Sequence, residues 1–190
     1  MSLVKVTPPT AEPITVTAAK IQLQETLIDV DNDAYIASLI GVAREAAEDR
    51  LGRSIMPTTW RLSMYAFPCE ILLPRPPVTS VTWVKYYDDN GDFQTLTADQ
   101  YDVDLDAEPA RIVPAYGVIW PTTRPGKPGA VQVQFVAGYA SVAAIPKPIV
   151  HWIKLAITEL YQHRDRSSDK PTVPNEFADH LLTNGLTIWR

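Results

Sequence analysis

Residues 71–96 read ILLPRPPVTSVTWVKYYDDNGDFQTL, and this stretch decides the fold. Two runs rich in β-branched and aromatic residues, Val78–Tyr87 and Asp92–Leu96, flank Asp89-Asn90-Gly91. An Asn-Gly pair supplies the positive φ angles that a tight hairpin turn needs, so the stretch predicts a β-hairpin. Three prolines within residues 74–77 precede it. Proline lacks a backbone donor, which excludes both a helix and a central strand there and predicts a stiff, extended lead-in.

Further short strands are predicted on both sides of this hairpin. Residues 59–66 alternate between apolar and polar positions, and residues 130–137 repeat the pattern, as half-buried strands do. Shorter strands are predicted at Glu70–Leu73, Tyr101–Leu105 and Arg111–Val113. Together they indicate a continuous antiparallel β domain over residues 57–140.

Two amphipathic helices flank the predicted β domain. Residues 34–51 place apolar side chains along one stripe, with Arg44, Glu45 and Glu48 on the opposite face. Pro146 and Pro148 open a second long helix, since proline is tolerated in a first helical turn, and Arg164 and Arg166 lie in its final turn. Shorter helices are predicted at residues 18–27, with Thr17 as N-cap, and at residues 175–182. We expect the two long helices to pack together.

The predicted fold class is therefore α+β, with a small helical bundle from the N- and C-terminal helices and an inserted antiparallel β domain. Residues 1–56 supply an N-terminal arm and bundle helices, residues 57–140 the inserted domain, and residues 141–190 the C-terminal helices and a tail. The arm, residues 1–16, is expected to lie outside the folded elements. It either packs on a neighbour or is loosely ordered.

Composition excludes several classes of function. A chain of 190 residues, 46% hydrophobic and 21% charged, can bury its own core. Its net charge of −5 disfavours binding nucleic acid by broad phosphate neutralisation. No run approaches the roughly 20 apolar residues of a membrane span, and the N-terminus lacks the pattern of a signal peptide. We therefore expect synthesis in the cytoplasm and no membrane partner.

The sequence carries no recognised motif for catalysis, metal binding or cofactor binding. It has no Gly-x-Ser-x-Gly, no phosphate-binding glycine loop, no His-Glu-x-x-His and no cysteine pair. His151 and His163 are twelve residues apart on one predicted helix, too far to share a metal. The single cysteine, Cys69, is predicted to be a small buried hydrophobe. These observations disfavour an enzyme.

A set of short motifs resembles the head-tail connector proteins, also called head completion or adaptor proteins, of tailed phages and prophages. Its centre is Leu73-Pro74-Arg75-Pro76-Pro77-Val78 followed by V-x-x-V-x-Y-Y-D-x-x-G at residues 81–91. The resemblance extends over about residues 17–165. The other matching motifs are Leu39-Ile40, Ala43-Arg44-Glu45, Leu51-Gly52-Arg53, Thr59-Trp60, Tyr101-Asp102-Val103, Trp120-Pro121, Val131–Tyr139 and Pro146–Arg164.

The resemblance implies a structural protein of virion assembly and DNA packaging. Such a subunit would form a homo-oligomeric ring under the portal protein, extend the DNA channel and offer a docking surface to the tail-completion protein. It would reside in the virion after assembly in the host bacterial cytoplasm, and it would need no cofactor and perform no reaction. DNA would pass through the ring without specific binding, which the negative net charge suits.

A closed ring requires two different contact faces on each subunit. The candidate interface residues on the long helix are Arg44, Glu45 and Glu48. The proline- and glycine-rich loop at residues 120–129 offers Trp120, Arg124 and Lys127, although this loop is alternatively a rigid connector. The tail offers Trp189, and the tail either folds back on the core or docks on another chain.

Two rival functions stay open at this stage. One is a tail-associated β-type module that binds carbohydrate or protein through aromatic residues exposed in a cleft. The other is a hydrolase built on the scattered carboxylates Asp102, Asp104, Asp106 and Glu108, which would require a concave site with perturbed pKa values.

Overall fold

The chain consists of two compact units in a computed structural model that describes residues 1–24, 30–163 and 182. The β unit comprises Met1–Thr10 and Met56–Ala140. The helical unit comprises Ala11–Ile55 and Ser141–Arg190. The predicted α+β class is confirmed.

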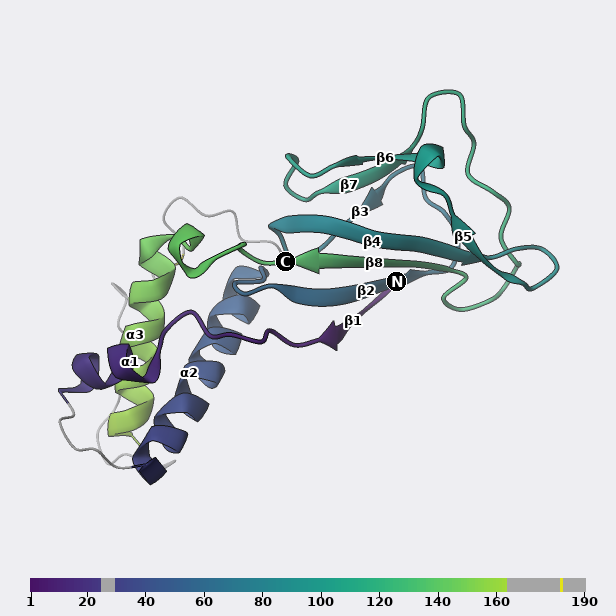
Figure 1. Cartoon of the computed structure of the whole chain (residues 1–190). Helices are drawn as coiled ribbons and strands as arrows, with labels where there is room; N and C mark the ends of the chain where they lie inside the picture. The colour runs from purple at the N-terminus through teal and green to yellow at the C-terminus, as the bar shows by residue number, and fades with distance from the viewer. Residues whose placement is uncertain (25–29, 164–181, 183–190) are drawn as a thin grey trace. The chain divides into compact units, whose positions relative to one another are not determined.

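A five-stranded antiparallel sheet forms the larger layer of the β unit (Figure 1). In spatial order its strands are β1 (Ser2–Thr7), β2 (Thr58–Met64), β8 (Val131–Ala137), β4 (Val78–Tyr87) and β5 (Phe93–Leu96). The predicted alternation is confirmed in β2 and β8, where every second residue is buried. Because the side-chain period of a strand is two, this pattern fixes which face of the sheet meets the core.

A three-stranded antiparallel sheet forms the second layer, in the order β3 (Ile71–Leu72), β7 (Arg111–Pro114) and β6 (Tyr101–Asp104). The short 3-10 helix η1 (Ala98–Gln100) leads into β6. Figure 1 shows this small sheet against one face of the larger one. Leu62, Val133 and Phe135 from the large sheet belong to the same buried cluster as Ile71 and Ile112 from the small one. The two sheets therefore share one apolar core.

The N-terminal segment differs from the expectation of an arm outside the folded elements. Residues 2–7 form β1, which pairs antiparallel with β2 from Ser2↔Ser63 to Thr7↔Thr59. Residues 1–10 thus belong to the β unit and not to the bundle. As an edge strand, β1 is exposed along most of its length, so it lacks the alternation that identifies a half-buried strand.

The predicted hairpin is confirmed, but its turn is not the expected one. β4 and β5 pair from Val84↔Leu96 to Tyr87↔Phe93. Gly91 donates its backbone N–H to the Asp88 carbonyl at 2.9 Å and has φ 93°, whereas Asn90 keeps a negative φ. This is the longer hairpin loop, in which a glycine with positive φ follows an ordinary turn. The Asp88 side chain favours it by accepting from the N–H groups of Asn90 and Asp92.

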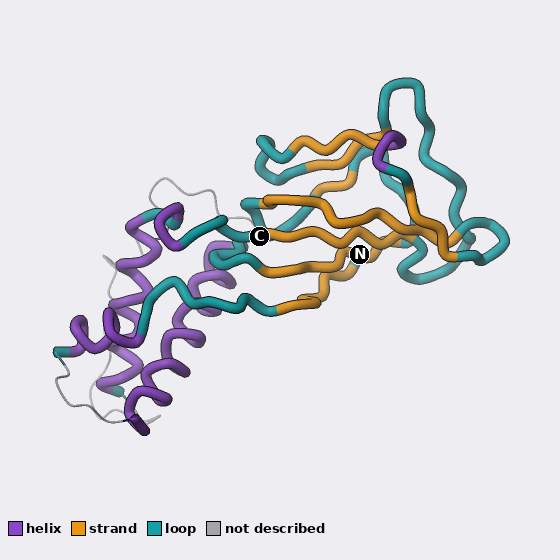
Figure 2. Tube along the Cα trace, in the orientation of Figure 1, coloured by secondary structure: helices purple, strands orange, loops and turns teal. Residues whose placement is uncertain are grey.

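The helical unit contains α1 (Val16–Leu23), α2 (Val30–Leu51), the 3-10 helix η2 (Val142–Ala144) and α3 (Lys147–Gln162). Figure 2 shows these helices in purple. The predicted packing of α2 on α3 is confirmed. The Tyr35 and Tyr161 rings lie 6.2 Å apart, and Asn32 Nδ2 donates to the Tyr161 hydroxyl at 3.3 Å. The buried apolar residues of the two helices are Ile36, Leu39, Ile40, Ala43, Ala47, Leu51, Ile149, Trp152, Ile153 and Ile157.

Two local predictions were wrong. Helix α1 is capped by Thr15, whose Oγ1 accepts from the Ala18 N–H at 3.2 Å, and not by Thr17. Cys69 is exposed, because it lies in the loop after β2 where Phe67 turns toward the core. Among the described residues no helix is long and apolar enough to cross a membrane. The predicted helix at residues 175–182, apart from Leu182, and the tail with Trp189 lie outside the described residues.

Candidate functional site

The first candidate surface, the polar face of α2, proves to be an internal ion-pair cluster. Arg44 Nε donates to Glu12 Oε2 at 2.8 Å, and Arg44 Nη1 donates to Glu48 Oε2 at 2.8 Å. Glu48 Oε1 accepts from the backbone N–H of Ile55 at 2.8 Å. Arg44 and Glu48 are each only 5% exposed. The cluster therefore joins the segment before α1, the middle of α2 and the chain just beyond it.

The guanidinium of Arg44 is held in its charged form. Burial by itself lowers the pKa of Arg44, but the hydrogen bond to Glu12 and the negative charges of Glu48, Glu12 and Glu45 outweigh it. The net result is a pKa above the ordinary value for arginine. A permanent cation here compensates two carboxylates, one of which is nearly inaccessible to water.

Arg44 and Glu48 were expected to face outward for contact with a neighbouring subunit, but both side chains are buried. Both make their strongest polar contacts within the helical unit. Glu45 does lie at the surface, with 56% of its side chain exposed, and its carboxylate is 3.6 Å from Arg44. Of these three candidates, Glu45 keeps its outward position.

The loop at residues 120–129 is bound to the β4–β5 hairpin. Thr122 Oγ1 donates to Asp89 Oδ2 at 2.6 Å, and the Arg124 backbone N–H donates to the Tyr87 carbonyl at 3.0 Å. Lys127 Nζ lies 4.0 Å from the centroid of the Tyr87 ring. Trp120 stacks on Phe67 with centroids 4.8 Å apart and packs against the core. Trp120 and Lys127 thus have intramolecular roles, while Arg124 stays exposed.

Asp88 organises the turn that this loop contacts. Its Oδ1 accepts from Asn90 and Asp92, and its Oδ2 accepts from Gln94 Nε2 at 3.0 Å. The Gln94 hydrogen bond is the largest cause that lowers the pKa of Asp88 below its ordinary value of 3.8. A lowered carboxyl pKa stabilises the folded form above the ordinary value, and the effect is lost as pH falls through the folded-state pKa. The turn should therefore weaken only at pH values below 3.8.

We predict that Gln94→Ala raises the pKa of Asp88 toward 3.8, because it removes the strongest donor to the ionised carboxylate. Titration of the Asp88 carboxyl by NMR measures the change. Thr122→Ala is the matched control, since Thr122 donates to Asp89 and not to Asp88. If the pKa of Asp88 is the same in the wild type and in Gln94→Ala, the hydrogen bond from Gln94 is not what lowers it.

The most exposed apolar side chains of the β unit lie in a segment that sequence reasoning missed. Tyr116 is 103% exposed and Ile119 is 89% exposed. A turn closed by the Val118 N–H and the Ala115 carbonyl at 2.9 Å, with Gly117 at φ 77°, holds Tyr116 away from the core. In sequence this segment, AYGVI at residues 115–119, is mostly apolar. The one local signal of a turn is Gly117.

The carboxylates of the hydrolase hypothesis lie on β6 and in the connection that follows it, and none of the four is buried. Asp104 pairs with Arg111 at 3.0 Å, and the hydrogen bond from Arg111 lowers the pKa of Asp104. A catalytic acid requires the opposite shift. Asp102, Asp106 and Glu108 are exposed. Across the described residues no group of three or more His, Cys, Asp or Glu side chains could hold a metal.

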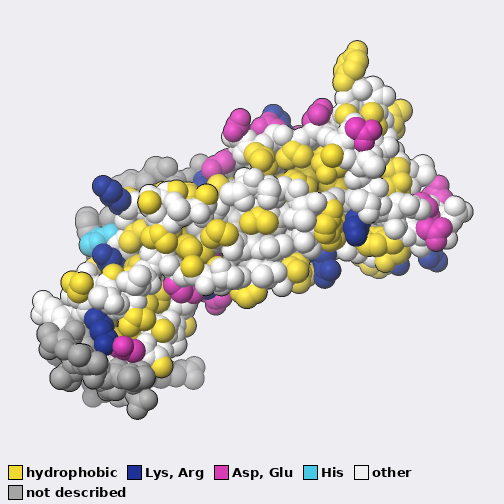
Figure 3. All heavy atoms as spheres, in the orientation of Figure 1, with side chains coloured by type: hydrophobic (Ala, Val, Ile, Leu, Met, Phe, Trp, Pro, Cys, Tyr) yellow, Lys and Arg dark blue, Asp and Glu magenta, His cyan; other side chains and the backbone are white. Residues whose placement is uncertain are grey.

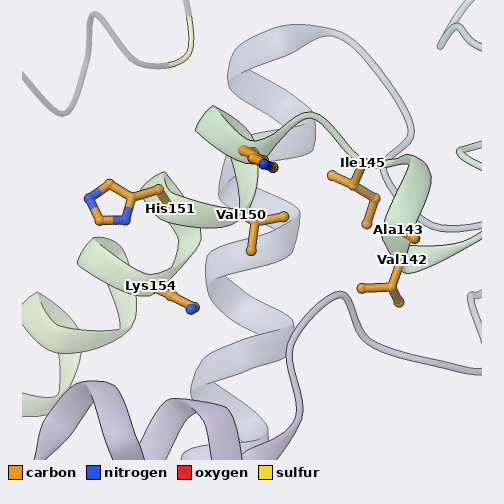
Figure 4. A pocket seen from close by; sticks show the side chains of 7 residues that line it. Val142, Ala143, Ile145, Val150, His151 and Lys154 are labelled. Atoms are coloured by element: carbon orange, nitrogen blue, oxygen red, sulfur yellow. The ribbon is translucent and has the colours of Figure 1, made fainter.

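A hollow of about 510 Å³ lies in the helical unit, where η2 meets the start of α3 (Figure 4). Its apolar lining is Val142, Ala143, Ile145 and Val150, and its ionisable lining is Lys147, His151 and Lys154. Figure 4 shows Lys154 reaching from α3 toward η2. We call this hollow the α3 groove. Among the described residues, the ionisable side chains that line the groove are all basic, although the chain as a whole is acidic.

Comparison with known proteins gives a result for structure alone. No family model matches the sequence, and no curated protein matches it. Solved structures match over the whole length. A chain from the neck of an empty gene transfer agent particle, computed with C6 symmetry, superposes with a TM-score of 0.80 at 24% identity, covering 100% of this chain and 97% of the other.

This protein has the fold of a neck chain. A chain from the virion of the native gene transfer agent particle gives a TM-score of 0.78 at 23% identity, with the same coverage of both chains. A chain from the neck of the native particle, computed with C12 symmetry, gives 0.67 at 23% identity, again with 100% and 97% covered. The shared fold thus includes both the helical unit and the β unit.

Proposed function

We propose that this protein is a structural subunit of the head-tail connector of a tailed phage, prophage or phage-like particle. The observation that carries the proposal is the likeness to neck chains, which covers 100% of this chain and 97% of the neck chain at a TM-score of 0.80. An accidental likeness between unrelated domains would rarely include both units and leave so little of either chain unmatched.

The same comparison supports assembly as a ring. The related necks were computed with C6 and C12 symmetry. Cyclic symmetry requires that one face of a subunit meets a different face of the next. In the proposed role, the ring lies under the portal protein and extends the DNA channel. It also gives the tail-completion protein a surface on which to dock.

Charge suits this role. With a net charge of −5, the subunit does not attract DNA by neutralising phosphates, so a channel built from it would let DNA slide. The candidate interface residues that remain on the surface are Glu45 and Arg124. The tail with Trp189 stays a further candidate. The subunit would be made in the bacterial cytoplasm and would end in the virion.

The test is assembly of the full chain, alone and with the portal protein of the same particle. Native mass spectrometry and electron microscopy should show a closed ring on the portal, with the C12 symmetry of the related neck. A chain that stays monomeric at all concentrations and does not bind the portal would contradict the proposal. Thermal melting of the same sample confirms that the chain is folded.

A further inference from the structure

The α3 groove has the chemistry of a docking site for an acidic, partly apolar segment. Ile145 is 4% exposed and closes its floor, whereas Val142 is 46% exposed at its edge. Lys147, His151 and Lys154 follow one another at helical spacing along one side of α3, which places them in a row beside this apolar lining. A ligand with a single apolar side chain between carboxylates would match both features.

The connection between β6 and β7, residues 105–110, carries such a segment. Leu105 is 39% exposed, Asp106 and Glu108 are exposed beside it, and Asp102 is exposed on the adjoining strand. Figure 3 shows several acidic side chains along the upper edge of the β unit, with a basic side chain among them. We call residues 102–108 the acidic tip.

The acidic tip is preorganised for binding. The Ala107 N–H donates to Asp104 Oδ1 at 3.1 Å, and Asp104 is in turn paired with Arg111 of β7 at 3.0 Å. The antiparallel pairing of β6 with β7 fixes both ends of the connection. A segment already held in its bound shape loses little conformational entropy when it docks.

We propose that in the ring the acidic tip of one subunit docks into the α3 groove of the adjacent copy of this chain. Leu105 enters the apolar part of the groove, and Asp102 and Asp106 face Lys147 and Lys154. The two surfaces are opposite in charge and lie on different units of the chain, as a ring-closing contact between unlike faces requires. DNA phosphates would match the lysines but would leave the apolar lining unfilled.

This inference rests on the proposed ring, and charge reversal tests it. The groove variant is Lys147→Glu with Lys154→Glu, and the tip variant is Asp102→Lys with Asp106→Lys. Each variant alone should raise the subunit concentration needed for half-maximal ring formation by about tenfold, and the four substitutions together should restore it to within about threefold. The matched control is Lys5→Glu with Lys85→Glu, which changes the net charge as much as the groove variant does.

A second measurement does not depend on charge. In a Cys69→Ser background, Lys154→Cys with Asp106→Cys should form oxidised chains of linked subunits in the ring, and either cysteine alone should not. If the groove variant forms rings at the same subunit concentration as the wild type, and the cysteine pair does not cross-link, the inference is overturned and the proposed function stays intact. The inference is also overturned if the groove variant forms rings normally but no longer binds the portal protein, because the groove then binds the portal protein and not a second copy of this chain. Absence of any wild-type ring refutes the proposed function and the inference together.

Discussion

Gly138→Ala is expected to lower the free energy of unfolding by at least about 3 kcal/mol, which corresponds to a fall in melting temperature of roughly 6–12 °C for a chain of this size. Gly138 follows β8 and has φ +126°, a conformation that residues with a side chain rarely adopt. A β-carbon there would lie 2.3 Å from the Met56 carbonyl oxygen and 2.7 Å from the Pro57 nitrogen.

Neither contact can be relieved by moving a side chain. Both atoms belong to the backbone just before β2, and the Gly138 N–H is itself bound to the Pro77 carbonyl at 2.8 Å. The entries to β2 and β4 and the exit from β8 therefore meet at one glycine.

Gly126→Ala separates the clash from the backbone strain. Gly126 has φ +69°, but an added β-carbon would meet nothing within 4 Å. We expect this control to lose only about 1–2 kcal/mol, the cost of a left-handed conformation. Thermal melting and soluble yield measure both variants. Equal losses at the two positions would show that close packing at Gly138 has no special importance.

Elements with a strong hydrophobic period could be predicted from sequence. In β2, β8, α2 and α3 the apolar positions recur with the period of the element, because one face of each lies against a core. The pattern therefore gave the correct secondary structure type for each and the correct buried side for β2, β8 and α3. In α2 the apolar stripe is buried as predicted, but Arg44 and Glu48 on the polar face are buried as well. The pairing of the two long helices followed from their matching apolar stripes.

The missed features depend on contacts between residues far apart in the chain. β1 is a strand because β2 supplies its partner 52 or more residues later, and its own pattern shows no buried face. The loop at residues 120–129 resembles a projecting loop until Thr122 is seen to bind Asp89 in the hairpin turn. Turn composition shows that a chain reverses direction, but not which neighbour it contacts.

The candidate site was the least predictable part for the same reason. Charged residues opposite an apolar stripe usually face solvent. Arg44 departs from that rule because Glu12, 32 positions earlier, lies over α2 and covers it. The α3 groove and the acidic tip are each assembled from ordinary surface residues, so no motif marks them.

Arg44→Leu is expected to lower the free energy of unfolding by about 3–5 kcal/mol, because removing one partner of a buried ion pair leaves the other charge uncompensated. The carboxylate most affected is Glu48, whose side chain is 6% exposed. Chemical denaturation of the folded chain measures the change, and the melting temperature should fall by roughly 6–20 °C.

Two further variants separate stability from assembly. Glu45→Gln alters a carboxylate that is 56% exposed and should change stability by less than about 1 kcal/mol. Glu48→Gln placed in the Arg44→Leu background should recover much of the loss, since the amide oxygen can still accept from the Ile55 N–H without a buried charge. If Arg44→Leu instead melts like the wild type and weakens only ring formation, Arg44 acts at a subunit interface after all. If Arg44→Leu lowers stability and the added Glu48→Gln restores it, the ion-pair cluster stabilises the helical unit itself. Only an internal contact would make folding depend on neutralising Glu48.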